Sequence, residues 1–291
     1  MEYNIPQINE YINTVKIDKS PHTLICYTTA INKMISFLKI ETFEDIKKLT
    51  SSDIRSHQSN MRETGLQPSS VNSNMRPLKA MFNWLVENEY LEASPTSKVK
   101  DLKAPKKLVA FLTEEEIAVM VSACKNILDK LIIVLLITTG LRSNELLSLK
   151  LSDVVGCHII VNGKGSKQRK LILQPDVCDL LNEWIKKRSK KYGDVSDYLL
   201  VSKARGRFAA NSLREKIRTI MRNGGIPEER IKQIHTHSLR HTFVANLFES
   251  GADIFTAQSA LGHQNLATTQ IYAHLRNSAL DRAMLNQKSI L

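Results

Sequence analysis

Apolar residues recur at helical spacing through the first ninety residues of this chain. Ser20-Pro21 opens a stretch with apolar residues at positions 24, 27, 31, 34, 35 and 38, which is the spacing of one helix face. Further helix starts are indicated at Thr50-Ser-Ser-Asp53 and at Ser69-Ser70, the latter before a longer apolar-periodic run. The pattern predicts a bundle of about four or five short helices without strands.

A segment rich in Pro, Ser, Lys and Ala follows, from Ser94 to Lys107, and it lacks a sustained apolar face. Such a composition is typical of a boundary between domains. We therefore expect an N-terminal domain at residues 1–94, a basic linker at 95–109 and a second domain at 110–291. The lysines of the linker either contact phosphates or belong to a plain solvated connection.

The second domain is predicted to be mainly helical with a small β-sheet. Thr113 and Glu116 have the spacing of a capping box, and an apolar helix runs from about Leu128 to a stop at Gly140. Two strand-like segments, 158–162 and 169–173, flank a glycine-rich turn at 163–166 and predict a hairpin. Helical patterns cover 176–190, 210–222, 238–250, 255–261 and 268–274. The expected fold class is therefore mainly α with a small sheet.

Charge adds a partner class to this picture. The 291 residues carry a formal net charge of +12. Up to Ala110 there are 15 basic and 12 acidic side chains, and after it there are 26 and 17. Most of the basic excess therefore lies in the second domain. It suits a polyanion, with nucleic acid first and an anionic membrane surface second, although a merely solvated basic surface has the same composition.

Neither a secretory signal nor a membrane span is expected. The start, Met1 to Pro6, has no basic residue and no long apolar run. The longest strongly apolar run, Leu131 to Ile137, is far shorter than the roughly 20 residues that a span needs. Four scattered cysteines without metal-type spacing are expected to be buried, inert thiols of a reducing cytoplasm: Cys26, Cys124, Cys157 and Cys178.

Candidate chemistry is concentrated near the C-terminus. His237 and Arg240 are three residues apart at a helix start, so they share a face, whereas His241 faces elsewhere and is expected to be a buried structural histidine. His263 follows a glycine at a helix end, and Tyr272 lies on an apolar-periodic helix. A tyrosine can be a nucleophile, histidines can move protons, and arginine can hold phosphate oxygens. Each residue alone also has an ordinary structural explanation.

A second group lies about a hundred residues upstream. Arg142 is expected at a turn between two helices, with Glu145 close enough to orient it, although a helix cap or a plain ion pair would look the same. Lys164 lies in the glycine-flanked hairpin turn, where it could reach a substrate as a general acid. Three further basic residues are expected to steer phosphates or to stay solvated: Lys167, Arg169 and Lys170.

Together these residues suit attack on a phosphodiester. The reaction builds a pentavalent phosphate with additional negative charge, which two arginine side chains can hold bidentately. A histidine is needed to take the phenol proton, because an unperturbed tyrosine has a pKa of about 10 and is a poor nucleophile at neutral pH. A lysine can protonate the departing oxygen. This chemistry requires no metal and no cofactor.

Five motifs in this order resemble the tyrosine recombinases, or phage-type integrases, and most closely their Xer-like two-domain branch. They are Thr-Gly-Leu-Arg-Ser-Asn-Glu-Leu at 139–146, Gly-Lys-Gly-Ser-Lys-Gln-Arg at 163–169, His-Ser-Leu-Arg-His at 237–241, Leu-Gly-His at 261–263 and Thr-Thr-Gln-Ile-Tyr-Ala-His at 268–274. The resemblance spans nearly the whole chain. No catalytic position of the family pattern is missing.

The resemblance implies a role for each candidate. Tyr272 would be the nucleophile that forms a 3′-phosphotyrosyl link. Arg142 and Arg240 would hold the scissile phosphate, and Glu145 would support the first of them. His237 would act in proton transfer, and His263 would donate a hydrogen bond to the phosphate. Lys164 would be the general acid, with Lys167 as a possible substitute.

The resemblance also implies an assembly. The two domains would form a C-shaped clamp around double-stranded DNA, and a tetramer would act on two sites through a Holliday junction in the cytoplasm. The amphipathic tail from Asn277 to Leu291 would dock on a neighbouring subunit, unless it packs on its own domain.

Three other functions remain open at this stage. A type IB topoisomerase would nick and reseal one strand with similar chemistry. A metal-dependent hydrolase could use His235, His237 and His241, although the sequence offers no well-spaced carboxylates beside them. The third is a DNA-binding protein without activity, against which the intact residue set argues.

Overall fold

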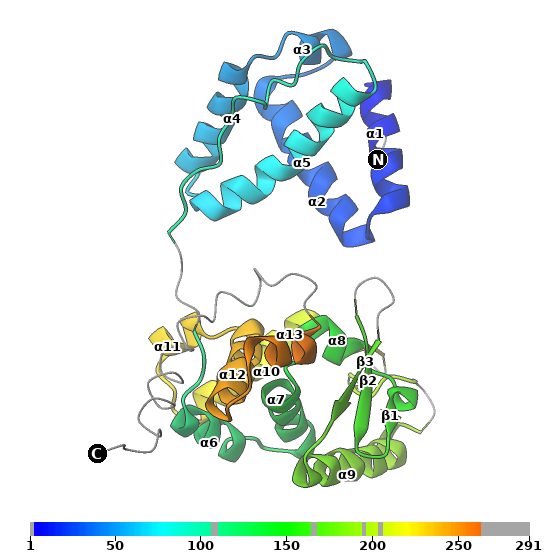
Figure 1. The fold of residues 1–291 in the computed structure, drawn as a ribbon, viewed down its shortest axis with the longest axis vertical. Helices are drawn as coiled ribbons and strands as arrows, with labels where there is room; N and C mark the ends of the chain where they lie inside the picture. Colours follow the sequence, from blue (N-terminus) through cyan, green and yellow to red (C-terminus); the bar gives the residue numbers. More distant parts are fainter. Residues whose placement is uncertain (1–2, 106–109, 164–167, 194–195, 203–205, 263–291) are drawn as a thin grey trace, which may run out of the picture. The chain divides into compact units, whose positions relative to one another are not determined.

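The computed structural model describes residues 3–105, 110–163, 168–193, 196–202 and 206–262 (Figure 1). The chain divides into two compact units, residues 1–107 and 108–291. In the first unit the described residues form five helices, which confirms the predicted bundle. They are α1 (Pro6–Asp18), α2 (Pro21–Leu38), α3 (Phe43–Lys47), α4 (Ser51–Glu63) and α5 (Pro68–Glu87).

Capping side chains begin α2 and α4 at two of the predicted helix starts, whereas the third, Ser69-Ser70, lies inside α5, which begins at Pro68 without a side-chain cap. The Ser20 hydroxyl accepts the backbone N–H of Thr23 at 3.2 Å, directly before α2. Thr50 and Asp53 form a reciprocal capping box at the start of α4. Helix α5 contributes fully buried side chains such as Leu78 and packs against α2 and α4. Burial of this apolar face therefore holds the bundle together.

The basic segment that follows α5 packs on this unit as far as Leu102. The Asn72 side chain exchanges two hydrogen bonds with the backbone of Leu102, both of 2.9 Å. Val99 is buried in the same apolar core, and Lys79 pairs with Asp101 at 2.6 Å. A stretch without a sustained apolar face is thus ordered by the buried residues Pro95, Thr96 and Val99 and by polar contacts with α5.

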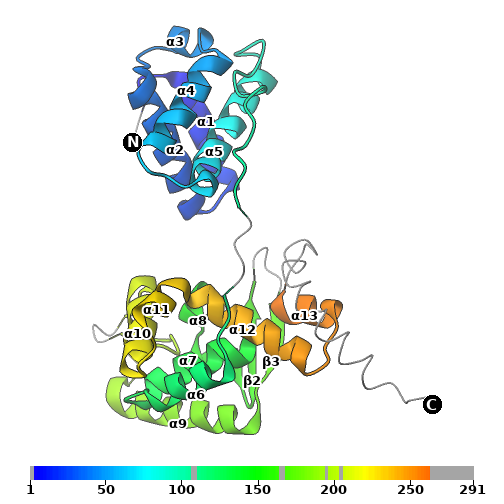
Figure 2. The same cartoon turned by 90° about the vertical axis from the view of Figure 1, so that its left-hand side faces the viewer.

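Helix α7 is the centre of the second unit. Six of its apolar side chains are buried, and α6, α9, α10 and α12 all pack against it (Figure 2). The described residues of this unit form the helices α6 (Glu114–Ser122), α7 (Ile127–Thr139), α8 (Ser143–Ser148), α9 (Pro175–Tyr192), α10 (Ala210–Asn223), α11 (Glu228–Gln233), α12 (Thr236–Glu249) and α13 (Ile254–Leu261). The predicted capping box at Thr113 and the stop at Gly140 are both present. The predicted helix at 268–274 lies outside the described residues.

A small antiparallel sheet accompanies these helices, which confirms the expected fold class. Its strands are β1 (Val154–Val155), β2 (His158–Asn162) and β3 (Gln168–Ile172), in the order β1-β2-β3. Strand β3 begins and ends one residue earlier than predicted, because Gln168 pairs with Asn162. Ile159 and Val161 point into the core, while Ile172 on the other face is 75% exposed. The sequence pattern gave no signal for the two-residue strand β1.

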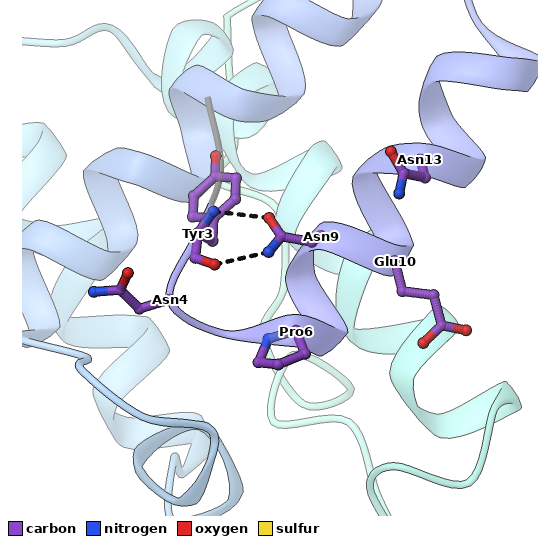
Figure 3. A pocket seen from close by; sticks show the side chains of 6 residues that line it. All are labelled: Tyr3, Asn4, Pro6, Asn9, Glu10 and Asn13. Atoms are coloured by element: carbon purple, nitrogen blue, oxygen red, sulfur yellow. Dashed lines mark hydrogen bonds between the residues drawn. The ribbon is translucent and has the colours of Figure 1, made fainter.

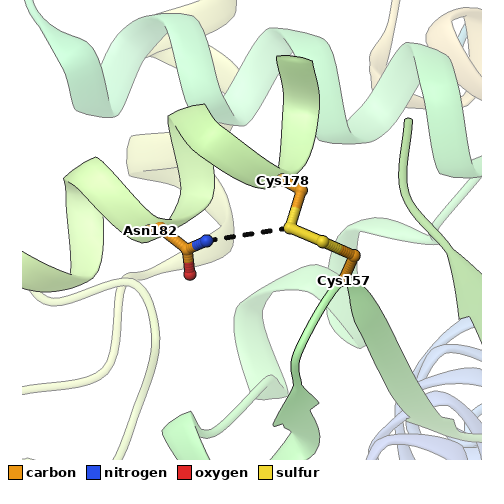
Figure 4. The surroundings of a disulfide bond; sticks show 3 residues. All are labelled: Cys157, Cys178 and Asn182. Atoms are coloured by element: carbon orange, nitrogen blue, oxygen red, sulfur yellow. Dashed lines mark hydrogen bonds between the residues drawn. A yellow bond between two sulfur atoms is a disulfide. The ribbon is translucent and has the colours of Figure 1, made fainter. Parts of the chain in front are cut away.

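The expectation of four buried thiols was wrong. Cys157 and Cys178 form a disulfide that joins the turn after β1 to the first turn of α9, with the Asn182 side chain 3.7 Å from one sulfur (Figure 4). Cys26 is an exposed thiol. Cys124 is half-buried, and burial raises the pKa of its thiol to about 11, so it is unreactive at neutral pH.

Within the described ranges, no helix is both long enough and apolar enough to cross a bilayer.

Candidate active site

Arg142 is held at the junction of α7 and α8. Helix α7 ends at Gly140, which adopts a left-handed conformation with φ of 60°. Arg142 is then the N-cap residue of α8, and Glu145, three residues on, reaches back to it. The Glu145 carboxylate accepts the Arg142 backbone N–H and one guanidinium nitrogen, both at 2.8 Å. The arginine side chain remains 37% exposed, so its outer edge is available to a ligand.

Arg240 approaches the same carboxylate from helix α12. Its side chain is only 4% exposed, and one guanidinium nitrogen lies 3.8 Å from a Glu145 oxygen. It also donates hydrogen bonds to the backbone carbonyls of Gly140 and, at 2.8 Å, of Leu261. Arg240 therefore ties together the end of α7, the end of α13 and the start of α8. Two arginines a hundred residues apart in sequence thus share one carboxylate.

Glu145 carries its negative charge at every pH at which the protein would act. Burial by itself would raise the pKa of this carboxyl group. Hydrogen bonds from the side chain of Arg169 and from the backbone and side chain of Arg142 more than offset that effect and lower the pKa to about 2. The site therefore contains one fixed anion among several fixed cations.

His237 lies one helical turn before Arg240 on α12, and its side chain is exposed. Partial desolvation, followed by the positive charges of Arg240 and Arg142, lowers its pKa below 6.5. The imidazole is consequently neutral at physiological pH and able to accept a proton. Such a neutral base beside two arginines is suited to activating a nucleophile that attacks an anionic phosphate.

The structure thus brings together four of the seven predicted site residues: Arg142, Glu145, His237 and Arg240. The other three, Lys164, His263 and Tyr272, lie outside the described residues, as does the alternative general acid Lys167. Their described neighbours adjoin the cluster. A hollow of about 270 Å³ beside Glu145 is lined by Gly163, which precedes Lys164. Gly262, which precedes His263, lies against Arg169.

Arg169 is the site residue whose contacts the sequence analysis missed. It was expected to steer phosphates or to remain solvated. Instead, its side chain is 13% exposed and pairs with both oxygens of Glu145, at 3.1 and 2.8 Å. Strand alternation was the available signal, because Arg169 has the same parity as the inward-facing Leu171 and the opposite parity to the exposed Lys170.

The other histidines do not extend the cluster. His235 is an exposed N-cap residue of α12, and His241 is half-buried, not fully buried as expected. In the part of the chain that the structure describes, no three His, Cys, Asp or Glu side chains are grouped as metal ligands would be. The grouping of His235, His237 and His241 required by a metal-dependent hydrolase is therefore not present.

A larger hollow, of about 560 Å³, lies beside the start of α1 and contains none of the predicted site residues (Figure 3). Its polar lining includes the Asn9 amide, which exchanges hydrogen bonds of 2.8 and 2.7 Å with the backbone of Tyr3. Asn9 thereby fastens the segment that precedes α1. The Asn9 amide in the lining of this hollow therefore has a structural role in the first unit.

Known proteins resemble this chain over most of its length. Residues 110–279 match the model of the phage integrase family, and residues 7–92 match its N-terminal SAM-like domain. The tyrosine recombinase XerC of Escherichia coli O157:H7 (strain EC4115) is 28% identical over 276 residues, which cover 92% of this chain and 91% of XerC.

Solved structures agree with the sequence comparison. The XerA recombinase is 28% identical with a TM-score of 0.56, and the match covers 97% of this chain and 99% of XerA. The XerH recombinase bound to its difH substrate is 23% identical with a TM-score of 0.72, over 92% of this chain and 80% of XerH. A DNA-bound lambda integrase (residues 75–356) shares the fold with a TM-score of 0.73 at 18% identity, over 92% and 94% of the two chains. This chain therefore belongs to the phage integrase family, as a tyrosine recombinase of the Xer-like type.

Proposed function

We propose that this protein is a site-specific DNA recombinase that cleaves and rejoins DNA through a 3′-phosphotyrosyl intermediate and exchanges strands between two sites. Besides family membership, the arrangement of three side chains supports this proposal. Arg142 and Arg240 converge on one carboxylate, and His237 beside them has a lowered pKa. Two fixed guanidinium groups and a neutral base are what a phosphodiester under attack requires.

In the proposed cleavage step, the Tyr272 oxygen attacks the scissile phosphorus while the bond to the 5′-oxygen breaks. His237 accepts the phenol proton, and Lys164, or Lys167 in its place, gives a proton to the departing 5′-oxygen. Arg142 and Arg240 hold the pentavalent phosphate, His263 donates a hydrogen bond to it, and Glu145 orients Arg142. Attack by a 5′-hydroxyl of a second duplex reverses the step and joins the exchanged strands. The reaction uses no cofactor and no metal ion.

The proposed division of labour follows the two units. Residues 1–94 and the catalytic domain, 110–291, would each bind double-stranded DNA, with the basic linker 95–109 along the phosphates. The excess of basic residues after Ala110 supports this partner. A tetramer would act on two DNA sites in the cytoplasm, with the tail Asn277–Leu291 exchanged between subunits. A lambda integrase tetramer bound to a Holliday junction, with 17% identity and a TM-score of 0.71, offers a precedent for such an assembly.

The nucleophile is tested with nicked suicide substrates, on which cleavage releases a short strand and traps the protein on DNA. Wild type should form a covalent adduct with the 3′ end, and Tyr272→Phe should form none. Tyr192→Phe, in α9 of the same unit, is the matched control and should react as wild type does. A covalent 3′ adduct of Tyr272→Phe would overturn the assignment.

The alternative functions give different results with the same protein. A type IB topoisomerase would relax supercoiled DNA without joining strands of two duplexes, so a two-duplex exchange assay with one labelled partner separates the two activities. A metal-dependent hydrolase would lose cleavage in EDTA and leave no covalent adduct. We expect exchange between duplexes and resistance to EDTA.

A further inference from the structure

Arg169 connects three segments of the site at once. It stands on β3, and its two terminal guanidinium nitrogens donate to the two oxygens of Glu145, at 3.1 and 2.8 Å. The same guanidinium group lies against Gly262, where an added Cβ would be 3.3 Å from one of its nitrogens. In sequence, β3 follows the turn that contains Lys164, and Gly262 precedes His263. Arg169 thus lies where the hairpin, α8 and the end of α13 meet.

The contact between Arg169 and Glu145 affects the net charge of the site. Three guanidinium groups, those of Arg142, Arg169 and Arg240, surround the single carboxylate of Glu145 at 2.8, 2.8 and 3.8 Å. The cluster therefore has a net charge of +2. Only Arg169 forms the parallel two-bond pair that best matches a carboxylate. Of the three, it is the natural partner to neutralise Glu145.

The exposed fractions of these side chains also favour Arg169 as the partner that neutralises Glu145. Arg169 is 13% exposed and Glu145 only 8%, whereas Arg142 is 37% exposed. Water and salt screen such a shielded pair less than an exposed one, so its two charges interact more strongly. Arg142 keeps an exposed edge, while Arg169 donates to both oxygens of the carboxylate.

We propose that Arg169 is a positioning residue of the recombination reaction. It neutralises Glu145, so that Arg142 and Arg240 direct their charge to the scissile phosphate. This inference rests on the proposed function. Without Arg169, the buried carboxylate turns to the other two arginines, and the net charge of the cluster falls to +1. The transition state carries one more negative charge than the bound phosphodiester. It therefore loses more electrostatic stabilisation than the ground state does.

The test measures single-turnover cleavage of a suicide substrate at saturating DNA, together with the Kd for DNA in a Tyr272→Phe background. Arg169→Gln should slow cleavage by about 10- to 100-fold and change the Kd by less than about threefold. The double variant Glu145→Gln/Arg169→Gln restores the net charge of +2 and should recover about tenfold of the loss. Lys187→Gln removes one positive charge from an exposed position on α9 and should leave the rate unchanged.

A bridging phosphorothiolate at the 5′ position separates the clamp from the general acid, because a thiolate leaves without a proton. This substrate should rescue Lys164→Ala but not Arg169→Gln. Rescue of Arg169→Gln would overturn the electrostatic role, as would a double variant that is as slow as the single one. If Arg169→Gln fails to fold by circular dichroism, Arg169→Lys keeps the charge without the paired geometry. Its expected slowing is about three- to tenfold, and a wild-type rate contradicts the proposal.

The proposed function and the proposed role of Arg169 can be refuted independently. Absence of any adduct from wild type would overturn the proposed function itself. A wild-type adduct together with an unimpaired Arg169→Gln would overturn the role of Arg169 alone.

Discussion

Gly140 is the position where the fold and the site depend most directly on the absence of a side chain. It ends α7 with φ of 60°, and its carbonyl accepts a hydrogen bond from Arg240. A Cβ at this position would lie 2.2 Å from Cδ1 of Phe243, which is itself buried. We predict that Gly140→Ala destabilises the second unit substantially.

The size of the effect can be worked from three contributions. Placing alanine in the left-handed region costs about 1–2 kcal/mol. Forcing apart a packed contact costs about 1–3 kcal/mol more. The smaller conformational freedom of the unfolded alanine chain returns about 0.4–1 kcal/mol. The expected net loss in the free energy of unfolding is about 1–4.6 kcal/mol, with a midpoint of about 3 kcal/mol.

Gly156→Ala is the matched control, because Gly156 has φ of 58° but no atom within 4 Å of an added Cβ. Its expected loss is about 1 kcal/mol, from the backbone conformation alone. Both variants are compared by urea unfolding in a Trp84→Phe background, where the fluorescence of the buried Trp184 reports on the second unit. Equal losses for the two variants would refute the collision with Phe243 and with it the packing of α12 on the end of α7.

Two further predictions follow from the site and the disulfide. The lowered pKa of His237 keeps its imidazole neutral below the pH at which a free histidine takes up a proton. On the acidic side of the pH profile, kcat/KM for cleavage should therefore fall with an apparent pKa below 6.5. An apparent pKa at or above that value would contradict the base role. Reduction of Cys157–Cys178, which closes a loop of 21 residues, should cost about 3 kcal/mol of stability in urea unfolding. The variant Cys157→Ser/Cys178→Ser should match reduced wild type and not respond to dithiothreitol, whereas an equal response of wild type and variant would contradict the assignment.

Local signals in the sequence predicted most of the fold. Capping side chains such as Ser20 and Thr113 act within one helical turn, so their pattern is legible without tertiary information. Gly140 was recognised as a helix stop for the same reason. The two-residue strand β1 was not predicted, because it is held by pairing with β2 and has no periodicity of its own.

Contacts across long sequence separations could not be predicted from local sequence patterns. Nothing in the spacing of Cys157 and Cys178 distinguishes a disulfide from two separate thiols, since pairing depends on how α9 packs beside the sheet. The side chain of Arg169 was expected to steer phosphates or to remain solvated, not to pair with a buried carboxylate. Its pairing with Glu145 spans 24 residues and depends on the register of β3. The residue types of the candidate site were recognisable by order along the chain, while the neutralisation of their charges was not.

The proposed function depends most directly on covalent linkage of Tyr272 to the 3′ phosphate of cleaved DNA. Trypsin should cut after Arg240 and Arg276, and the peptide 241–276 between them contains a single tyrosine. Wild type is trapped on a suicide substrate, digested with trypsin and nuclease, and analysed by mass spectrometry. We expect a nucleotide phosphate on this peptide, attached at Tyr272. A nucleotide on any other peptide, or an adduct with the 5′ end of the DNA, would contradict it.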